Sequence, residues 1–163
     1  MISNLDELFV EVTRITKIDK LLSSSLLLEK YRGDDWKKHL CESDCIHLDS
    51  CQKKTTYHKV MVCADDTIEM FIIKWDKFAE SCIHDHPEFG CIVKLLHGKL
   101  KEDVYEATDH GIKFCSTNIL NKNDIGYKES NKIIHKITNI HDDYSVSLHI
   151  YSKPNYKHNS YVL

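Results

Sequence analysis

Two histidines that alternate with an aspartate are the residues of this sequence with the clearest chemical potential. His84 and His86 flank Asp85. In a strand, alternate side chains share a face, so the two imidazoles would lie side by side while Asp85 faces away. Neutral imidazoles suit zinc, copper, iron or nickel, so the pair predicts a metal site without naming the metal. Two surface histidines in a chain with 11 His are the alternative interpretation.

Residues further along the chain favour the metal interpretation. Cys91 follows the histidine pair, Gly98 lies in an expected hairpin turn, and His135 lies on an expected strand four residues before Asn139. This order resembles the two-motif signature of the cupin superfamily. Most cupins carry a glutamate where this chain has Cys91, so the cysteine is the informative departure.

The cysteine narrows the resemblance to one family. The run over residues 84–102 is similar to the signature of the cysteine dioxygenase family, and residues 147–154 resemble that family's last barrel strand. Trp75 lies nine residues before the first histidine, as a tryptophan does in the family, and a fainter match covers residues 29–36. The resemblance therefore covers most of the chain, with its segments in the family's order.

The resemblance implies both a metal and a reaction. By position, His84, His86 and His135 would hold a mononuclear non-haem Fe(II). The family's reaction adds both atoms of O₂ to the sulfur of a small thiol, so we expect L-cysteine to be converted to cysteine sulfinic acid. Three neutral ligands leave the iron its full charge, which favours binding of a thiolate.

Other functions remain open at this point. Another small thiol, such as 3-mercaptopropionate, is an alternative substrate. A cupin that uses zinc, manganese or nickel without oxygen chemistry is an alternative enzyme, and a binding or sensor module with a vestigial site is the alternative outside enzymes.

The segment over residues 145–151 alternates polar and apolar side chains, and a polar face usually meets solvent. The family reverses this assignment, because there the polar face lines the pocket. The resemblance implies that Ser147, His149 and Tyr151 form a hydrogen-bonded relay beside the iron. Cys91 and Tyr151 match the positions of the family's thioether cross-link, so all four residues are expected to be catalytic. A small buried hydrophobic residue is the alternative role for Cys91.

The expected substrate-binding residues depart from the family at one position. An arginine two residues after a tyrosine usually binds the amino acid's carboxylate, whereas this chain has Tyr57, His58 and Lys59. Lysine is a point charge that cannot form the bidentate fork of arginine. We expect Tyr57, Lys59 and Tyr151 to contact the substrate. With lysine in place of arginine, either the carboxylate is bound more weakly, or His58 helps to bind it, or the preferred thiol differs. A solvated charge is the alternative for Lys59.

Hydrophobic periodicity predicts the elements that position these residues. Apolar residues recur every three or four positions over 5–15 and predict a helix with a capping signal at Ser3 and Asp6. A second helix is expected over 26–38, broken or offset near Gly33. Short β-branched and aromatic runs predict strands over 60–63, 68–75, 91–96, 100–105, 113–119, 133–137 and 145–151.

These elements predict a mainly β fold, a cupin-type antiparallel β-barrel (jelly-roll sandwich) with an N-terminal helical segment. The length of 163 residues suits one domain over 1–163. We expect a mostly helical part over 1–55, the barrel over 56–155 and a C-terminal tail over 156–163. The family's C-terminal segment is expected to be shortened here, at one wall of the pocket.

Composition excludes several classes of partner. The 22 basic and 25 acidic residues argue against nucleic acid or an anionic membrane as partner. No apolar run reaches about 18 residues, and the acidic start does not resemble a signal peptide. Seven cysteines, an odd number, favour a reducing cytoplasm and metal or redox chemistry over a disulfide framework. A cytoplasmic monomer is expected.

The remaining cysteines and histidines are expected to lack a direct role. A zinc knuckle from Cys41, Cys45, His47 and Cys51 is disfavoured, because one residue between the ligand pairs leaves no room for the usual loop. His141 is a weaker ligand candidate than His135. Strand or loop thiols are expected at Cys63, Cys82 and Cys115, and surface side chains at His39, His97, His110 and His158.

Overall fold

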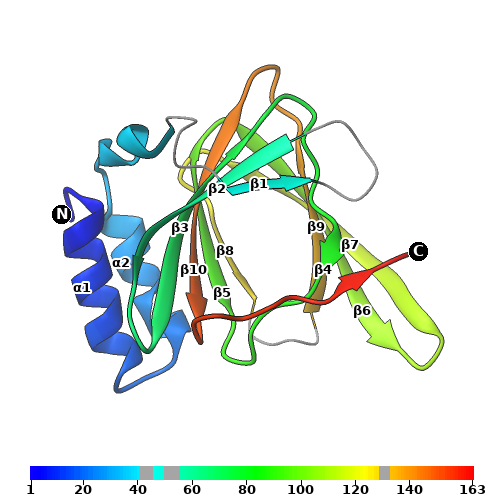
Figure 1. Ribbon diagram of the computed structural model, residues 1–163, viewed down its shortest axis with the longest axis horizontal. Coiled ribbons are helices and arrows are strands. Elements are labelled where there is room, and N and C mark those ends of the chain that lie inside the picture. The colour runs from blue at the N-terminus through cyan, green and yellow to red at the C-terminus, as the bar shows by residue number, and fades with distance from the viewer. Residues whose placement is uncertain (41–45, 50–55, 129–132) are drawn as a thin grey trace.

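The first 40 residues are helical, and strands make up most of the remaining chain (Figure 1). The computed structural model describes residues 1–40, 46–49, 56–128 and 133–163, with 46–49 described for the backbone alone. The helical elements are α1 (Leu5–Thr16), the 3-10 helix η1 (Leu21–Ser24), α2 (Ser25–Lys30) and the 3-10 helix η2 (Asp35–Leu40).

Helix α1 buries one apolar stripe, as its periodicity predicts. Its N-cap is Asn4, whose Oδ1 accepts a hydrogen bond from the Glu7 backbone N–H at 2.8 Å, one residue beyond the predicted Ser3. The Ser3 backbone N–H donates to the Glu7 carboxylate at 3.0 Å, so Glu7 also holds the residue before the cap. The buried residues of the helix are Leu5, Leu8 and Val12.

The second predicted helix is interrupted near Gly33, as expected. Helix α2 ends at Lys30, and η2 begins at Asp35. The Asp35 carboxylate accepts hydrogen bonds from the Leu5 backbone N–H at 2.9 Å and from the Tyr31 hydroxyl at 2.7 Å. This one side chain therefore fixes both helices relative to each other.

Two antiparallel sheets form the barrel. The larger has the strand order β1-β2-β3-β10-β5-β8, and the smaller has the order β11-β4-β9-β6-β7. Figure 1 shows the sheets facing each other, with α1 and α2 outside the larger one. The strands are β1 (Ile46–Asp49), β2 (Thr56–Ala64), β3 (Ile68–Trp75), β4 (Ile83–His84), β5 (Cys91–His97), β6 (Lys99–Thr108), β7 (Gly111–Asn121), β8 (Ile125–Lys128), β9 (Ile133–Asn139), β10 (Ser145–Ser152) and β11 (Ser160–Tyr161).

The structure confirms the predicted mainly β fold with an N-terminal helical segment. Each of the seven predicted strands overlaps an observed one, and the run over 68–75 coincides with β3. The prediction missed β1, β4, β8 and β11, which are two to four residues long. Such short strands carry too few residues to show a period.

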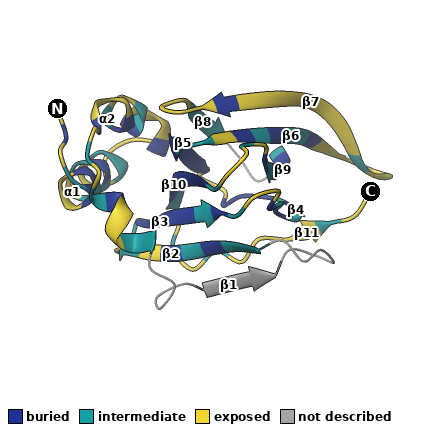
Figure 2. Cartoon of the chain, turned by 90° about the horizontal axis from the view of Figure 1, so that it is seen from above, coloured by how far each residue is buried: buried dark blue, intermediate teal, exposed yellow. Residues whose placement is uncertain are grey.

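Two separate layers of buried apolar side chains form the core, and Figure 2 shows buried residues both beside the helices and between the sheets. One layer joins the helices to the outer face of the larger sheet, and Val146, Leu148 and Ile150 of β10 belong to it. A second layer, which includes Phe71, Trp75 and other residues, belongs to the inner faces of the barrel. The apolar face of β10 thus packs against the helices, so its polar face points into the barrel.

Asn139 organises the turns at one end of the barrel. Its Nδ2 donates to the backbone oxygens of Trp75, Asp76 and Asp143 at 3.1, 3.0 and 2.8 Å. Its Oδ1 accepts from the Ser145 hydroxyl at 2.7 Å. The asparagine four residues after His135 is therefore a structural residue that joins β3, β9 and β10.

Cys82 corrects one expectation from the sequence. It is disulfide-bonded, whereas Cys63, Cys91 and Cys115 are free. The prediction of a free thiol at Cys82 is wrong, because an odd cysteine count still leaves room for a pair. Its partner and the disfavoured zinc knuckle lie outside the described residues, and the cytoplasmic location stays a prediction.

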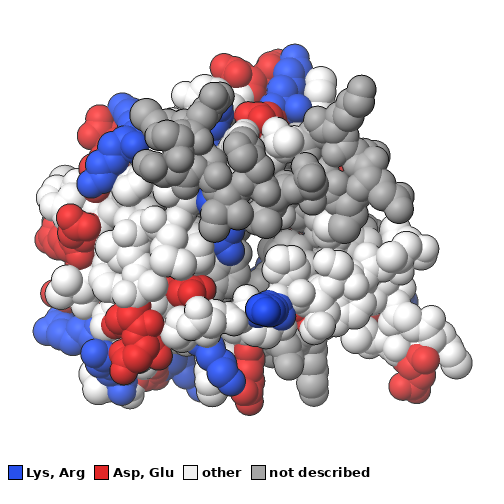
Figure 3. Space-filling view, viewed as in Figure 1, with Lys and Arg blue, Asp and Glu red and all other residues white. Residues whose placement is uncertain are grey.

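On the face shown in Figure 3, the described residues do not favour one sign of charge. Lys and Arg side chains lie among Asp and Glu side chains over the described part of the face in Figure 3. In the described parts of the chain, no helix has both the length and the apolar character needed to cross a membrane. The expected lack of a nucleic-acid partner and the monomeric state stay predictions.

Candidate metal centre and pocket

Three histidine side chains from the smaller sheet converge on one point. His84 ends β4, His86 follows two residues later, and His135 lies in β9, where it pairs with His84 across the sheet. The Nε2 atom of His135 lies 3.0 Å from Nε2 of His86 and 3.2 Å from Nε2 of His84. Candidate ligand atoms of the three residues all lie within 4.8 Å of one another.

The other ring nitrogens show why this cluster fits a metal. Nδ1 of His84 donates to the Cys82 backbone oxygen at 2.9 Å, and Nδ1 of His86 donates to the Ile133 backbone oxygen at 3.1 Å. Nδ1 of His135 donates to the Glu102 carboxylate at 2.6 Å. A neutral imidazole protonated at Nδ1 carries its lone pair on Nε2. Three lone pairs therefore face one another, and a cation would turn this repulsion into coordination.

Burial keeps the three rings neutral. It lowers the pKa of His84 to about 4 and lowers the pKa values of His86 and His135 well below the usual value. The neutral form is the one that binds metals, so these ligands are available without loss of a proton.

A buried ion pair supports His135 from behind. Glu102 is 4% exposed, and its second carboxylate oxygen accepts from Lys128 Nζ at 2.9 Å and from Asn118 Nδ2 at 3.1 Å. Neither Glu102 nor Lys128 was predicted from the sequence to support the site. The available signal was alternation, because Glu102 shares a face of the predicted strand with the apolar Leu100.

Strand β10 carries a chain of hydrogen bonds on its inward face. Trp75 Nε1 donates to Ser147 Oγ at 2.8 Å, and Ser147 Oγ donates to His149 Nε2 at 2.8 Å. Burial lowers the pKa of His149 well below the usual value, so the neutral ring carries its proton on Nδ1. That Nδ1 donates to the Tyr151 oxygen at 3.3 Å, so Tyr151 accepts this hydrogen bond and keeps its own hydroxyl proton.

Cys91 lies beside the end of this chain. Strands β5 and β10 pair Cys91 directly with Tyr151, so the two residues are neighbours across the sheet. Cys91 is fully buried, and burial raises the pKa of its thiol to about 12. The two residues expected to form a cross-link therefore lie side by side.

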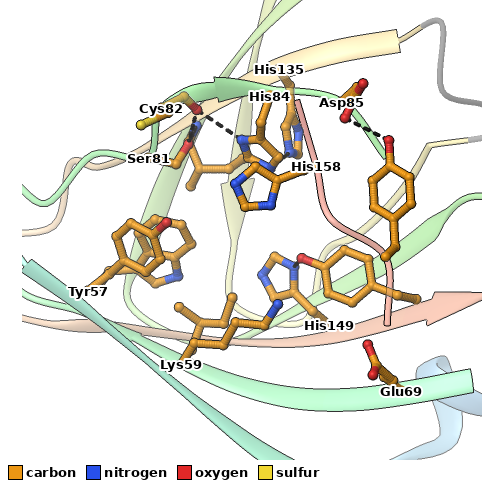
Figure 4. A pocket seen from close by; sticks show the side chains of 15 residues that line it. Tyr57, Lys59, Glu69, Ser81, Cys82, His84, Asp85, His135, His149 and His158 are labelled. Atoms are coloured by element: carbon orange, nitrogen blue, oxygen red, sulfur yellow. Dashed lines mark hydrogen bonds between the residues drawn. The ribbon is translucent and has the colours of Figure 1, made fainter. Parts of the chain in front are cut away.

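A small pocket opens above these residues, with a volume of about 50 Å³. One water molecule needs roughly 10–15 Å³ by this measure, so the pocket suits a small molecule. Figure 4 shows side chains from both sheets around it. Its polar lining includes Tyr57, Lys59, Glu69, His84, His135, His149, Tyr151 and His158.

Lys59 points into the pocket. Its Nζ lies 3.8 Å from the centre of the Phe71 ring and 4.7 Å from the centre of the Tyr151 ring, and burial lowers its pKa. Tyr57 stacks on Trp75 with ring centres 4.8 Å apart. His58 does not line the pocket, because its Nε2 faces the Asp76 carboxylate at 3.2 Å.

Two residues given other roles from the sequence also contribute here. Asp85 faces away from the histidines, as expected, and its buried carboxylate binds the C-terminal segment. His158 is exposed, as expected, yet its ring lines the pocket at 5.2 Å from the ring of His84. No local pattern could indicate this position, which depends on the fold of the segment after β10.

The barrel has the cupin fold, and its three convergent histidines form a candidate metal site. Among solved structures, a TM-score of 0.55 relates the chain to oxalate decarboxylase from Bacillus subtilis, at 20% identity over 73% of this chain and 30% of that one. A cupin-like protein from Thermotoga maritima gives 0.52, at 15% identity over 71% of this chain and 85% of that one. Likeness at these identities shows the fold alone.

The chain belongs to the cysteine dioxygenase type I family, whose sequence profile matches residues 12–162. Cysteine dioxygenase type 1 of Danio rerio is 34% identical over 90 residues, which are 52% of this chain and 45% of the relative. The Homo sapiens protein is 34% identical over 89 residues, covering 52% and 44%. The aligned part thus spans less than half the length of these relatives. The predicted family is confirmed.

Proposed function

We propose that this protein is an iron-dependent thiol dioxygenase that adds both atoms of O₂ to the sulfur of L-cysteine, giving cysteine sulfinic acid. The observation that most supports this proposal is that three Nε2 lone pairs converge beside a pocket that is also lined by Lys59 and Tyr151. Bound Fe(II) would supply the binding and activation of the thiolate and of O₂.

The protein's own groups would orient the substrate and control one proton. Lys59 offers a positive charge to the carboxylate, and the small pocket limits the substrate to a short thiol. His149 donates to the Tyr151 oxygen, so the Tyr151 hydroxyl can donate its proton toward a ligand at the metal. Ser147 and Trp75 hold His149 in the tautomer that this requires.

We also propose that Cys91 and Tyr151 form a thioether. A bond between Cys91 Sγ and a Tyr151 ring carbon would replace an S–H and a C–H bond, and O₂ would accept the two electrons and two protons. Pairing of the two residues across β5 and β10 supports this reaction. Intact-mass analysis after turnover should then show a species lighter by two hydrogen atoms, absent from Cys91→Ser.

Oxygen uptake tests the dioxygenase proposal. Protein loaded anaerobically with Fe(II) should consume one O₂ for each L-cysteine and produce the sulfinate, and 3-mercaptopropionate and cysteamine serve as comparison thiols. His86→Ala should lose iron and activity together. Iron-replete protein that shows no thiol-dependent uptake, or an active and iron-binding His86→Ala, would overturn the proposal.

A further inference from the structure

The segment after β10 folds back across one end of the barrel. Residues 153–161, here called the strap, run from the larger sheet to the smaller one, as the red trace in Figure 1 shows. The Asn155 backbone N–H donates to the Glu69 carboxylate at 3.0 Å, and Ser160 and Tyr161 of β11 pair with β4. The strap thus joins both sheets at the pocket.

Asp85 anchors the strap through both carboxylate oxygens. Oδ1 accepts from the Tyr156 hydroxyl and from the Asn159 backbone N–H, both at 2.8 Å. Oδ2 accepts from Asn159 Nδ2 at 2.7 Å and from the Tyr161 hydroxyl at 3.2 Å. Asp85 is 4% exposed and lies between two candidate metal ligands. The position of the strap is therefore set by the backbone that carries those ligands.

The strap brings His158 to the pocket wall opposite Lys59. Figure 4 shows the His158 ring above the pocket, near His84, and the Lys59 side chain below it. Lys59 and His158 both line this pocket, so their side chains border the same space. An exposed histidine is not needed for packing. Its ring N–H offers a second hydrogen-bond donor beside the single ammonium of Lys59.

We propose that His158 is a substrate-binding residue that, together with Lys59, binds the carboxylate of the thiol substrate, and that Asp85 positions it through the strap. This inference rests on the proposed thiol dioxygenase function. A lysine alone offers a point charge, whereas two donors from opposite walls fix the direction of a carboxylate. Neutral imidazole suffices, because one ring nitrogen always carries a proton.

Binding to cobalt-substituted protein without O₂ tests the inference apart from turnover. L-cysteine and cysteamine share the thiol and amine, but cysteamine lacks the carboxylate. Thiolate-to-cobalt absorption reports the Kd of each. Because a hydrogen bond to a charged group contributes about 1.5–3 kcal/mol, His158→Ala should raise the Kd for L-cysteine about 10-fold or more. Cysteamine should change less than about 2-fold, and bound cobalt should stay constant.

Matched variants separate binding from structure. His158→Gln keeps an N–H donor and should recover part of the lost affinity, while Lys157→Ala, an exposed neighbour outside the pocket lining, should behave as wild type. Asp85→Asn should reduce the preference for L-cysteine as His158→Ala does. Adding His158→Ala to Asp85→Asn should cause little further loss, because the two act through one contact.

Several outcomes would overturn the inference. The first is an equal rise in the Kd of both thiols in His158→Ala, and the second is an unchanged Kd for L-cysteine. The third is loss of cobalt from that variant, which would make His158 a metal ligand. Absence of thiolate absorption in wild type would overturn it together with the thiol function. If the cobalt protein prefers L-cysteine to cysteamine as expected but the iron-loaded protein consumes no O₂ with either thiol, only the dioxygenase proposal would be overturned.

Discussion

Each of the three histidines has an oxygen partner at Nδ1, and these partners leave Nε2 free of a proton for a metal. Two are backbone oxygens, whereas His135 donates to the carboxylate of Glu102. A carboxylate behind a metal-bound histidine raises the basicity of the ligand and fixes its ring. Lys128 balances the charge of Glu102, so the pair adds no net charge beneath the site.

Glu102→Gln should weaken metal binding. The amide oxygen can still accept from His135, but Lys128 loses its counter-charge and the histidine loses its charged partner. We expect metal affinity to fall about 10- to 100-fold, measured by competition with a chelator. Asp103→Asn is the matched control, because Asp103 faces the other side of β6 and pairs with Lys101. Equal affinities for the two variants would contradict this role.

Lys59→Arg should improve the binding of carboxylate-bearing thiols. Arginine offers a planar fork for the carboxylate. It also stacks on aromatic rings, so it could keep the contacts that Lys59 makes with Phe71 and Tyr151. We expect the KM for L-cysteine to fall in Lys59→Arg and to rise in Lys59→Ala, with little change for cysteamine in either. Parallel changes for both thiols would remove Lys59 from the carboxylate site.

At this scale the sequence identifies residues that share a local motif. His84, His86, Cys91 and Tyr151 stand out by type and spacing, and the structure brings them to one region. Glu102 and His158 could not be found in this way. Glu102 contacts His135, which is 33 residues away along the chain, so only the register of the sheet brings them together. His158 lies near His84 only because the strap folds back across the barrel.

At the scale of elements, one buried lysine joins the helices to the barrel. Lys94 of β5 is 1% exposed, and its Nζ donates to the backbone oxygens of Leu28 and Tyr31 at 2.6 and 2.8 Å. These oxygens lie at the C-terminal end of α2, where the last carbonyls of a helix have few or no partners within the helix. Lys94 therefore caps the helix from a neighbouring strand.

Lys94→Met should destabilise the fold, by about 1–3 kcal/mol, because each of the two carbonyls loses one of its donors in a buried place. Burial lowers the pKa of Lys94 to about 8, below the ordinary value of 10.5. Between these values only the unfolded state holds the proton, so wild-type stability should rise with pH. Urea unfolding at several pH values would show this rise in wild type but not in the variant; matching pH slopes would contradict it.

The longer strands were predictable because their alternation is local. Strand β3 was found with its observed bounds, whereas β4 and β11 contain two residues each and depend on pairing with each other. The sequence also could not specify that β10 lies between β3 and β5. That placement comes from long-range pairing, and it is what puts Tyr151 beside Cys91.

At the scale of the whole molecule, the site joins the two sheets. The histidine cluster belongs to the smaller sheet and to the segment that follows β4, whereas Lys59 and Tyr151 belong to the larger sheet. A metal and a substrate that contact both sets would connect the two halves of the barrel. Metal binding should therefore stabilise the entire fold.

Metal loading should raise the Tm of the wild-type protein. At a free metal concentration 100 times the Kd, the gain is about 2.7 kcal/mol, or roughly 5–10 °C for a chain of this size. Calorimetry of metal-free and loaded protein measures it. His86→Ala, which lacks one ligand, should show a much smaller rise, and equal shifts in the two proteins would place the binding elsewhere.

The flanked position of β10 has a consequence for local opening of the molecule. Backbone amides of β10 are bonded to strands on both sides, whereas the strap is held by the short β11 and by Asp85. Amide hydrogen exchange should therefore be slow along β10 and fast along the strap. If the strap exchanges faster, its opening would expose the pocket while the strand with Ser147, His149 and Tyr151 stays paired.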